Sequence, residues 1–255
     1  MRAPRAPGDF AGDFPDLKMP LLRSRISARP NASDTLRCFE ATMLHPKLKA
    51  LGLGLGLFVA VYAPAFMTTA LVRPRIEIAI PLIIAITLLV ALILVILLAR
   101  RPAGITEFGF RIPTSRYIAI AGAFGLTLGL AVTSLSRLFP SRPPFDVSSF
   151  TPWMIGLYFL IGASIQEEVI FRGLIQSMVE RRWTVTFSLP GVSLSGAVAF
   201  TAALFGVIHL EAGAVVALGA ILLGLVAGEL RRRSGSLLPA ILVHALFNSA
   251  DIFWR

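Results

Sequence analysis

Cysteine and charge are what this sequence has least of. Only 15% of its 255 residues are charged, and Cys38 is the single cysteine. One cysteine excludes an internal disulfide and a cysteine-ligated metal cluster, and because it precedes the first long apolar run it also excludes thiol catalysis within the apolar core. Hydrophobic residues make up 56% of the chain and the mean hydropathy is +0.78, values typical of polytopic membrane proteins. We therefore expect an all-α fold, a polytopic membrane helix bundle of about seven transmembrane helices.

Acidic residues are scarcer than basic ones. The chain has 14 Asp and Glu against 24 Lys and Arg, a formal net charge of +10. Such an excess can indicate a nucleic-acid partner, but here the basic residues cluster directly outside apolar runs, as topology signals do. We therefore expect a lipid bilayer as the partner and no nucleic acid. Residues 1–49 hold nine Lys and Arg and five Asp and Glu without sustained periodicity, which predicts a basic, largely disordered cytoplasmic tail near anionic headgroups.

The remaining residues, 50–255, predict one multi-span membrane domain. A charge-free run such as Ala50–Val72, with 23 residues, is long enough to cross about 30 Å of hydrocarbon. The predicted spans share this apolar character and are Ala50–Val72, Ile78–Ala99, Tyr117–Ser136, Thr151–Val179, Ser193–His209, Ala212–Gly228 and Leu237–Phe253.

The loops between these spans carry unequal numbers of basic residues. Eighteen Lys and Arg lie on the side of the N-terminus and five on the other side, with Arg231–Arg233 assigned to a loop between the sixth and seventh spans. The positive-inside rule then places the N-terminus in the cytoplasm. Without the basic tail the numbers are nine against five, which keeps the same orientation.

The fourth span is the one that carries an acidic pair in its middle. Two adjacent carboxylates, Glu167 and Glu168, cost several kcal/mol at bilayer depth unless they are paired, hydrated or used in function. Glu168 and Arg172 are four residues apart on one helix face, which predicts an ion pair. Glu167 points about 100° away around the helix and has no such partner in its own turn. An unpaired carboxylate in this setting suits a general base.

Histidines are rare, and two of the three in the chain lie in apolar runs. His209 ends the fifth predicted span, while His244 and Asn248 share one helix face in the seventh. Taken singly, each has a structural interpretation, as a packing histidine or as a polar contact between helices. Glu167 and His244 fall near mid-membrane and His209 near one end, so their convergence requires a tilted helix, a shortened helix or a dipping loop.

Three motifs occur in a fixed order: Glu167-Glu168-xxx-Arg172, Phe205-xxx-His209 and His244-xxx-Asn248. Together they resemble the motifs of the CPBP family of intramembrane proteases, which includes the type II CAAX prenyl endopeptidases and the bacterial Abi proteins of bacteriocin processing and self-immunity. The resemblance covers residues 151–253, which would be the catalytic core. It implies an intramembrane endopeptidase of the bacterial inner (plasma) membrane, acting on a membrane-embedded or lipid-modified peptide, with a prenylated CAAX-type peptide as one candidate.

The resemblance also implies a role for each motif residue. Glu167 and His209 would activate a water that attacks the peptide carbonyl. His244 and Asn248 would donate hydrogen bonds to the developing oxyanion. The supporting residues would be Glu168, Arg172 and Phe205.

Other interpretations of the same residues stay open. Two histidines and a glutamate can hold catalytic zinc, although the HExxH spacing is absent and Asn248 would be a poor ligand, so we expect no cofactor. A non-catalytic membrane protein that binds a partner, in bacteriocin immunity or envelope regulation, would use the site for binding alone. A transporter is disfavoured because the sequence has no internal repeat. The sequence carries no signal for a particular oligomeric state.

Overall fold

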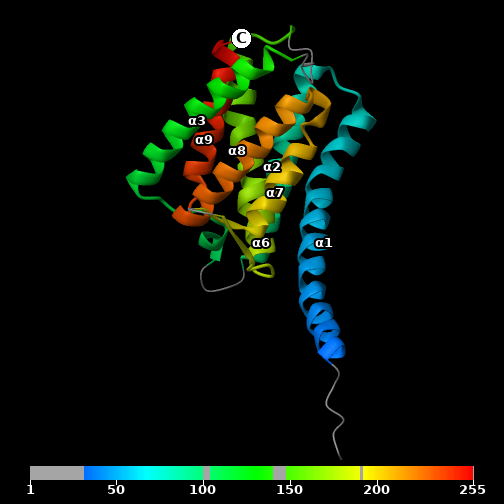
Figure 1. Ribbon diagram of the computed structural model, residues 1–255. Helices are drawn as coiled ribbons and strands as arrows, with labels where there is room; N and C mark the ends of the chain where they lie inside the picture. Colours follow the sequence, from blue (N-terminus) through cyan, green and yellow to red (C-terminus); the bar gives the residue numbers. More distant parts are fainter. Residues whose placement is uncertain (1–31, 100–103, 140–147, 190–191, 255) are drawn as a thin grey trace, which may run out of the picture. The chain divides into compact units, whose positions relative to one another are not determined.

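The computed structural model describes residues 32–99, 104–139, 148–189 and 192–254 (Figure 1). The chain divides into two units, residues 1–40 and 41–255, and the membrane domain belongs to the second. Residues 1–31 of the basic tail lie outside the described residues. The first helix, α1 (Ala32–Val72), begins within the expected tail, so residues 32–49 are helical. Leu, Ala, Lys, Arg, Glu and Met, which favour helices, make up ten of these 18 residues, in keeping with the early start.

Each predicted span is represented by an apolar helix, which confirms the all-α membrane bundle. In the described part of the chain five helices are long and apolar enough to cross a membrane: Pro46–Val72, Ile76–Leu98, Ser115–Ser136, Pro152–Glu180 and Ala214–Ser234. The second, third and fifth of these are α2 (Ile76–Leu98), α3 (Ser115–Ser136) and α8 (Ala214–Ser234). The fourth consists of several helical segments. Two shorter apolar helices, α7 (Gly196–Val207) and α9 (Leu238–Trp254), complete the set.

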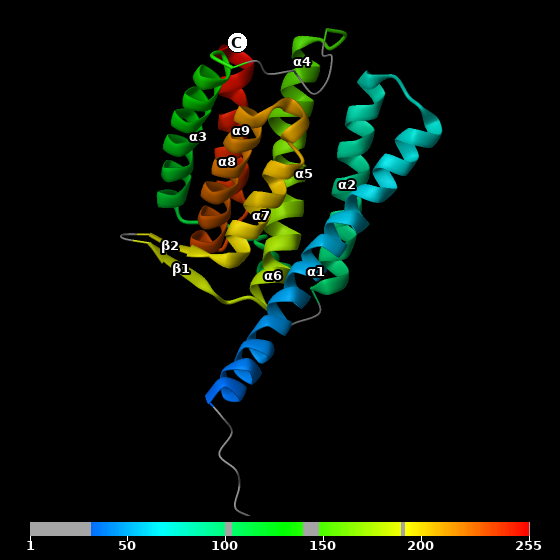
Figure 2. The ribbon, with the colours of Figure 1, turned by 45° about the vertical axis from the view of Figure 1, so that its right-hand side comes forward.

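The fourth span is one helix with two π-helical stretches. It consists of α4 (Pro152–Ile155), η2 (Gly156–Gly162), α5 (Ala163–Glu168), η3 (Val169–Gln176) and α6 (Ser177–Glu180), and Figure 2 shows it running from α4 at the top to α6 at the bottom. A π-helical turn is wider than an α-helical turn and is often found at functional sites. The second π-helical stretch, η3, follows directly on Glu167 and Glu168.

The predicted fifth span, Ser193–His209, is wrong at its start. Two antiparallel strands, β1 (Thr186–Leu189) and β2 (Val192–Ser195), form a hairpin before α7 begins at Gly196. The alternation Val-Ser-Leu-Ser has the period of a strand, and it was overlooked among apolar residues. With 12 residues, α7 is only about 18 Å long. His209 therefore follows a shortened helix, directly before the short helix η4 (Leu210–Ala212).

The predicted sixth span, Ala212–Gly228, is too short at its end. Helix α8 continues to Ser234 and includes the basic run Arg231–Arg233, which we had assigned to a loop. Glu229 forms ion pairs with Arg232 and Arg233, at distances of 2.8 Å and 3.0 Å, and these pairs stabilise the last turns. The helix ends where Gly235 takes a left-handed conformation with φ of 67°.

Close approach of small residues sets the position of α9. Helices α3 and α9 lie side by side (Figures 1 and 2). A Cβ atom added at Gly125 would lie 2.8 Å from Leu246 Cβ, and one added at Gly129 would lie 2.8 Å from Ala250 Cβ. The pair Gly125-xxx-Gly129 thus lets α3 pack directly on the helix that carries His244.

A segment between α2 and α3 holds the junction of α8 and α9. It contains the short helix η1 (Gly104–Phe108). Leu237 N donates to Gly109 O at 2.9 Å, and Ser236 Oγ donates to Arg111 O at 2.5 Å. The guanidinium of Arg111 also donates to Ser234 O at 2.9 Å. These contacts fix the start of α9.

Candidate active site

Glu168 is the most enclosed polar residue of the site. It ends α5, and its side chain has no exposed surface. Oε1 lies 3.1 Å from Nη1 of Arg172, also fully buried, so the predicted ion pair is present. The same oxygen lies 2.8 Å from Nδ1 of His244. One carboxylate thus joins a cation of its own helix to a histidine of α9.

This contact sets the orientation of the His244 ring. The carboxylate of Glu168 is an acceptor, so Nδ1–H of His244 donates to it. Nε2 then faces the other acid, 3.7 Å from Oε2 of Glu167. A histidine held through one ring nitrogen by a carboxylate presents the other nitrogen in a fixed direction, the arrangement that tunes many functional histidines.

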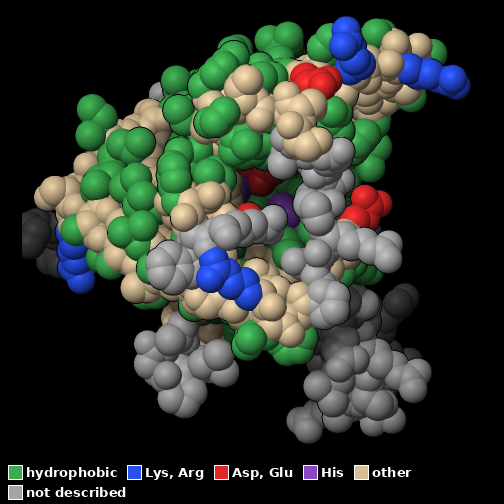
Figure 3. All heavy atoms as spheres, turned by 90° about the horizontal axis from the view of Figure 1, so that it is seen from above, with side chains coloured by type: hydrophobic (Ala, Val, Ile, Leu, Met, Phe, Trp, Pro, Cys, Tyr) green, Lys and Arg blue, Asp and Glu red, His purple; other side chains and the backbone are tan. Residues whose placement is uncertain are grey.

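The two adjacent glutamates have different surroundings. Glu168 is buried, whereas the side chain of Glu167 is 18% exposed. Figure 3 shows acidic and histidine side chains at the bottom of a hollow in the upper face, among hydrophobic side chains. Of the pair, Glu167 is therefore the carboxylate that an external molecule can reach.

Phe205 brings the two predicted histidines to the same place. Its ring is 1% exposed and lies 4.6 Å from the ring of His209 and 5.7 Å from that of His244, centroid to centroid. The guanidinium of Arg172 lies over the ring of Phe205, 4.7 Å from the ring centroid. This is a cation–π contact, and it makes Phe205 the packing centre of the site.

His209 is oriented by the helix that precedes it, α7. Nδ1–H donates to the carbonyl oxygen of Phe205 at 2.7 Å, because a carbonyl can only accept. In the neutral ring Nε2 is then the acceptor. The structure brings both histidines to Phe205, without a hydrogen bond or ion pair between His209 and Glu167 among the described residues.

Asn248 lies one helical turn beyond His244 and contacts the fourth span. Its Nδ2 donates to the carbonyl of Phe159 at 3.0 Å and to Oγ of Ser164 at 3.4 Å. Both of its N–H groups therefore hold α9 against the helix that carries the acidic pair. The predicted role as an oxyanion donor requires one of them to change partner.

Sequence reasoning missed three residues of the site. Phe159 and Ser164 receive the amide of Asn248, and Tyr62 of α1 accepts a hydrogen bond from Gln166 Nε2 at 3.4 Å. Ser164 lies four residues before Glu168, so its place on that helix face was available from spacing. A single Tyr in an apolar span was the signal for Tyr62, because buried phenols usually have a partner.

The residues present do not assemble a zinc site. In the described ranges no group of three or more His, Cys, Asp or Glu side chains is placed to hold a metal ion. Nδ1 of His209 is bonded to a carbonyl and Nδ1 of His244 to Glu168, and the two rings contact Phe205 rather than a shared point. Nε2 of each ring is not used in these bonds, so it is the placement of the side chains, not the bonding at Nδ1, that leaves the described residues without a metal-binding group.

Comparison with known proteins locates a family domain on this site. Residues 149–250 match the model of the family described as type II CAAX prenyl endopeptidase Rce1-like. The match spans all three motifs and confirms the resemblance that they predicted. No curated protein and no solved structure matches the chain.

Proposed function

Because residues 149–250 are a type II CAAX prenyl endopeptidase Rce1-like domain, we propose that this integral membrane protein is an endopeptidase that hydrolyses a peptide bond within the bilayer. The observation that carries the proposal is the contrast between the two glutamates. Glu168 is buried and paired, while Glu167 is partly exposed beside Nε2 of His244. Only one of two adjacent carboxylates is then available for chemistry, and it lies next to an oriented imidazole.

In the proposed reaction Glu167 is the general base. It takes a proton from a water molecule whose oxygen bonds to the scissile carbonyl carbon. The carbonyl oxygen becomes the oxyanion of a tetrahedral intermediate. The C–N bond then breaks as Glu167 returns the proton to the leaving nitrogen, which yields a carboxylic acid and an amine, and the acid then passes its proton to the amine or to solvent. Nε2 of His209, the acceptor atom of the neutral ring, holds the water on its second side.

His244 stabilises the oxyanion in this scheme. In its imidazolium form Nδ1–H donates to Glu168 and Nε2–H is directed to the oxyanion, next to Glu167. The charges of Glu168 and Arg172 cancel, and Glu168 orients the His244 ring through its hydrogen bond without competing as a base. Asn248 supplies the second donor when one N–H leaves Ser164, the longer of its two contacts at 3.4 Å.

The family supports a peptide substrate that is embedded in the membrane or carries a lipid, and a prenylated CAAX-type carboxyl terminus is the specific candidate. The distribution of basic residues supports a cytoplasmic N-terminus, and we place the protein in a bacterial inner membrane. No step of the scheme uses a cofactor.

Cleavage by the purified, full-length protein in lipid nanodiscs tests the proposal. The probes are a farnesylated peptide that ends in a CAAX sequence and the same peptide without farnesyl, with products identified by mass spectrometry. Wild type should release the terminal tripeptide from the farnesylated probe, and Glu167→Gln should not.

Glu211→Gln is the matched control, since Glu211 is an exposed acid close to His209 in the chain and its loss should leave cleavage intact. Cleavage of neither probe by folded wild type, together with a cellular phenotype that Glu167→Gln leaves unchanged, would favour the non-catalytic binding protein instead.

A further inference from the structure

Polar residues recur at every fourth position along the helix of the acidic pair. Glu168, Arg172, Gln176 and Glu180 are separated by four residues each, and we call these four the polar file. The first three are fully buried and the fourth is partly buried. The residues between them are largely apolar. This spacing places the polar file on one side of the helix, from the candidate site to the helix end.

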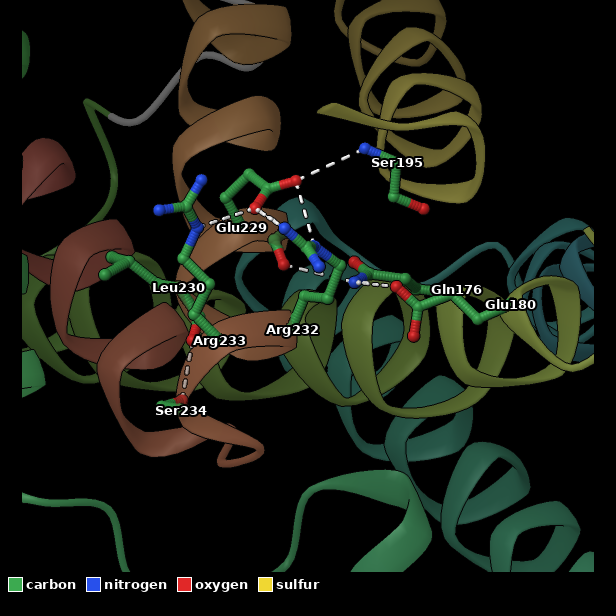
Figure 4. Close-up of polar contacts among 9 residues, drawn as sticks. Gln176, Glu180, Ser195, Glu229, Leu230, Arg232, Arg233 and Ser234 are labelled. Carbon is green, nitrogen blue, oxygen red and sulfur yellow. Dashed lines mark hydrogen bonds and ion pairs between the residues drawn. The ribbon is translucent and has the colours of Figure 1, made fainter. Parts of the chain in front are cut away.

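Contacts link the two ends of the polar file. At the upper end His244 donates to Glu168 at 2.8 Å, and Glu168 pairs with Arg172 at 3.1 Å. At the lower end Gln176 Nε2 donates to Oε1 of Glu180 at 3.0 Å, as Figure 4 shows. Hydrogen bonds or ion pairs thus join the neighbours within each half of the polar file. None of these contacts joins Arg172 to Gln176, and we call this gap the open step.

The open step is where hydrogen-bonding capacity is left over. Oε2 of Glu168, all three nitrogens of the Arg172 guanidinium and Oε1 of Gln176 are buried without a hydrogen-bond partner among protein atoms, the ion pair of Nη1 apart. Donors and acceptors are thus both present, on successive turns of one helix. Buried polar atoms in proteins are bonded in the great majority of cases, and where side chains do not serve, buried water does.

Helix α8 packs closely beside this step. Two glycines of α8, Gly224 and Gly228, face the polar file. A Cβ atom added at Gly224 would lie 3.1 Å from Nη2 of Arg172, and one added at Gly228 would lie 3.1 Å from Oε1 of Gln176. Backbone rather than side chain therefore faces both unpartnered groups, and the carbonyl of Gly228 accepts from Gln176 Nε2 at 3.1 Å.

The lower end of the polar file opens into a pocket. The pocket measures about 350 Å³ and its lining is charged and polar: Glu107, Ser177, Glu180, Arg181 and Arg231. Glu107 and Arg181 have side chains that are 24% and 19% exposed, so the pocket reaches the surface. Ser177 accepts from Arg231 at 3.1 Å and donates to the carbonyl of Arg172 at 3.4 Å. The pocket is thereby joined to the polar file.

We propose that the polar file is a water path from this pocket to Glu168 and His244. Its ligand is water, held between the Arg172 donors and the acceptors of Glu168 and Gln176. Hydrolysis consumes one water per turnover, and a peptide that fills the upper hollow blocks the direct route. The water path begins at the opposite end of the helix and supplies water to the site from the side away from the hollow. This supply role rests on the proposed function, whereas occupancy by water does not.

Radiolytic footprinting of the full-length protein in nanodiscs tests occupancy, because X-ray-generated hydroxyl radicals label side chains that touch bound water even when these are buried. Phe205, 1% exposed and in contact with Arg172, is the reporter. We expect Phe205 to be labelled in wild type and several-fold less in Gln176→Leu. Ile175→Leu, a fully buried position next to the polar file, is the control and should leave labelling unchanged.

Gln176→Met is the second variant, should Gln176→Leu fail to fold. An unlabelled Phe205 in wild type, or equal labelling in folded wild type and Gln176 variants, overturns the water path.

Kinetics on a cleaved peptide tests the supply role. Loss of the path should lower kcat by roughly tenfold and leave KM unchanged, since Gln176 does not contact the hollow that admits the peptide. Reduced labelling with an unchanged kcat would contradict the supply role. Labelled wild type that cleaves no peptide would leave the water path in place and remove the proposed function.

Discussion

Oε1 of Glu168 lies 2.8 Å from Nδ1 of His244, and this contact joins residues that are 76 positions apart in the chain. It explains why the two adjacent glutamates differ. The inner one is used to hold Arg172 and the histidine, and the outer one is left 3.7 Å from the free side of the same ring. Glu168 thus has a structural role, and Glu167 is available for chemistry.

Arg172→Met should destabilise the protein strongly. The substitution leaves Glu168 as a buried charge without its cation, and breaking a buried pair in this way costs about 3–5 kcal/mol. Thermal unfolding in nanodiscs should show a large decrease in Tm. The double variant Glu168→Gln/Arg172→Met removes both charges and should recover most of it. Arg233→Met removes an ion pair whose arginine is 52% exposed, and it should change stability by about 0–1 kcal/mol. Equal shifts for Arg172→Met and Arg233→Met would refute this account.

His244→Ala should lower cleavage without a matching change in KM. Removing one oxyanion donor typically reduces kcat by about 10²–10³-fold. The control is Ser249→Ala on the same helix, whose hydroxyl donates to the carbonyl of Leu246 in its own turn. Steady-state kinetics on the farnesylated peptide measures both. Retained kcat in a folded His244→Ala protein would remove this residue from the mechanism.

Asn248→Asp should weaken the contact between α9 and the fourth span. A carboxylate cannot donate to the carbonyl of Phe159, and it would place two acceptors 3.0 Å apart. Both Tm and kcat should fall. Ser164→Ala removes only the longer contact of the same amide, at 3.4 Å, and should have the smaller effect on Tm. A Tm for Asn248→Asp equal to that of wild type would show that the amide does not position α9.

Gly125→Leu should displace the helix that carries His244 and Asn248. A side chain at this position meets Leu246 and the backbone of α9 at 2.8 Å, and overpacking of this kind costs about 1–3 kcal/mol. Tm and cleavage should both decrease. Gly122→Leu is the matched control, since a Cβ there meets nothing within 4 Å. If the two variants behave alike, the close packing of α3 on α9 is not what holds the site.

Chelators should leave cleavage unchanged. In the described part of the chain no three His, Cys, Asp or Glu side chains are placed to hold a metal ion. Incubation of the purified protein with EDTA and then with an excess of zinc measures the effect on turnover. Loss of activity on chelation that zinc restores would establish the metalloprotease alternative.

Local spacing predicted the parts of the site that depend on one helix. The Glu168–Arg172 pair follows from an i,i+4 relation, and it is present at 3.1 Å. The three motifs predicted the family whose model matches residues 149–250. The bond between Glu168 and His244 could not be predicted, because it depends on how α9 packs against α3 and the fourth span.

Boundaries failed where two signals competed. Ser193–Ser195 lies in a strand because its alternation has a period of two, although the surrounding residues are apolar enough for a span. Arg231 was assigned to a loop by its charge. It is instead buried in the last turns of α8, where its Nη2 donates to the carbonyl of Glu107 at 2.8 Å and to Ser177. Partners distant in the sequence make such a buried arginine possible.

Comparison of membrane peptides from cells that carry wild type, Glu167→Gln or Glu211→Gln tests the central claim most directly. Quantitative mass spectrometry of peptide abundance and of new carboxyl termini is the measurement. We predict at least one membrane protein whose cleaved terminus appears with wild type and Glu211→Gln and is lost with Glu167→Gln. Identical termini and abundances in all three strains, with the three proteins present at equal levels, would contradict intramembrane proteolysis by this chain.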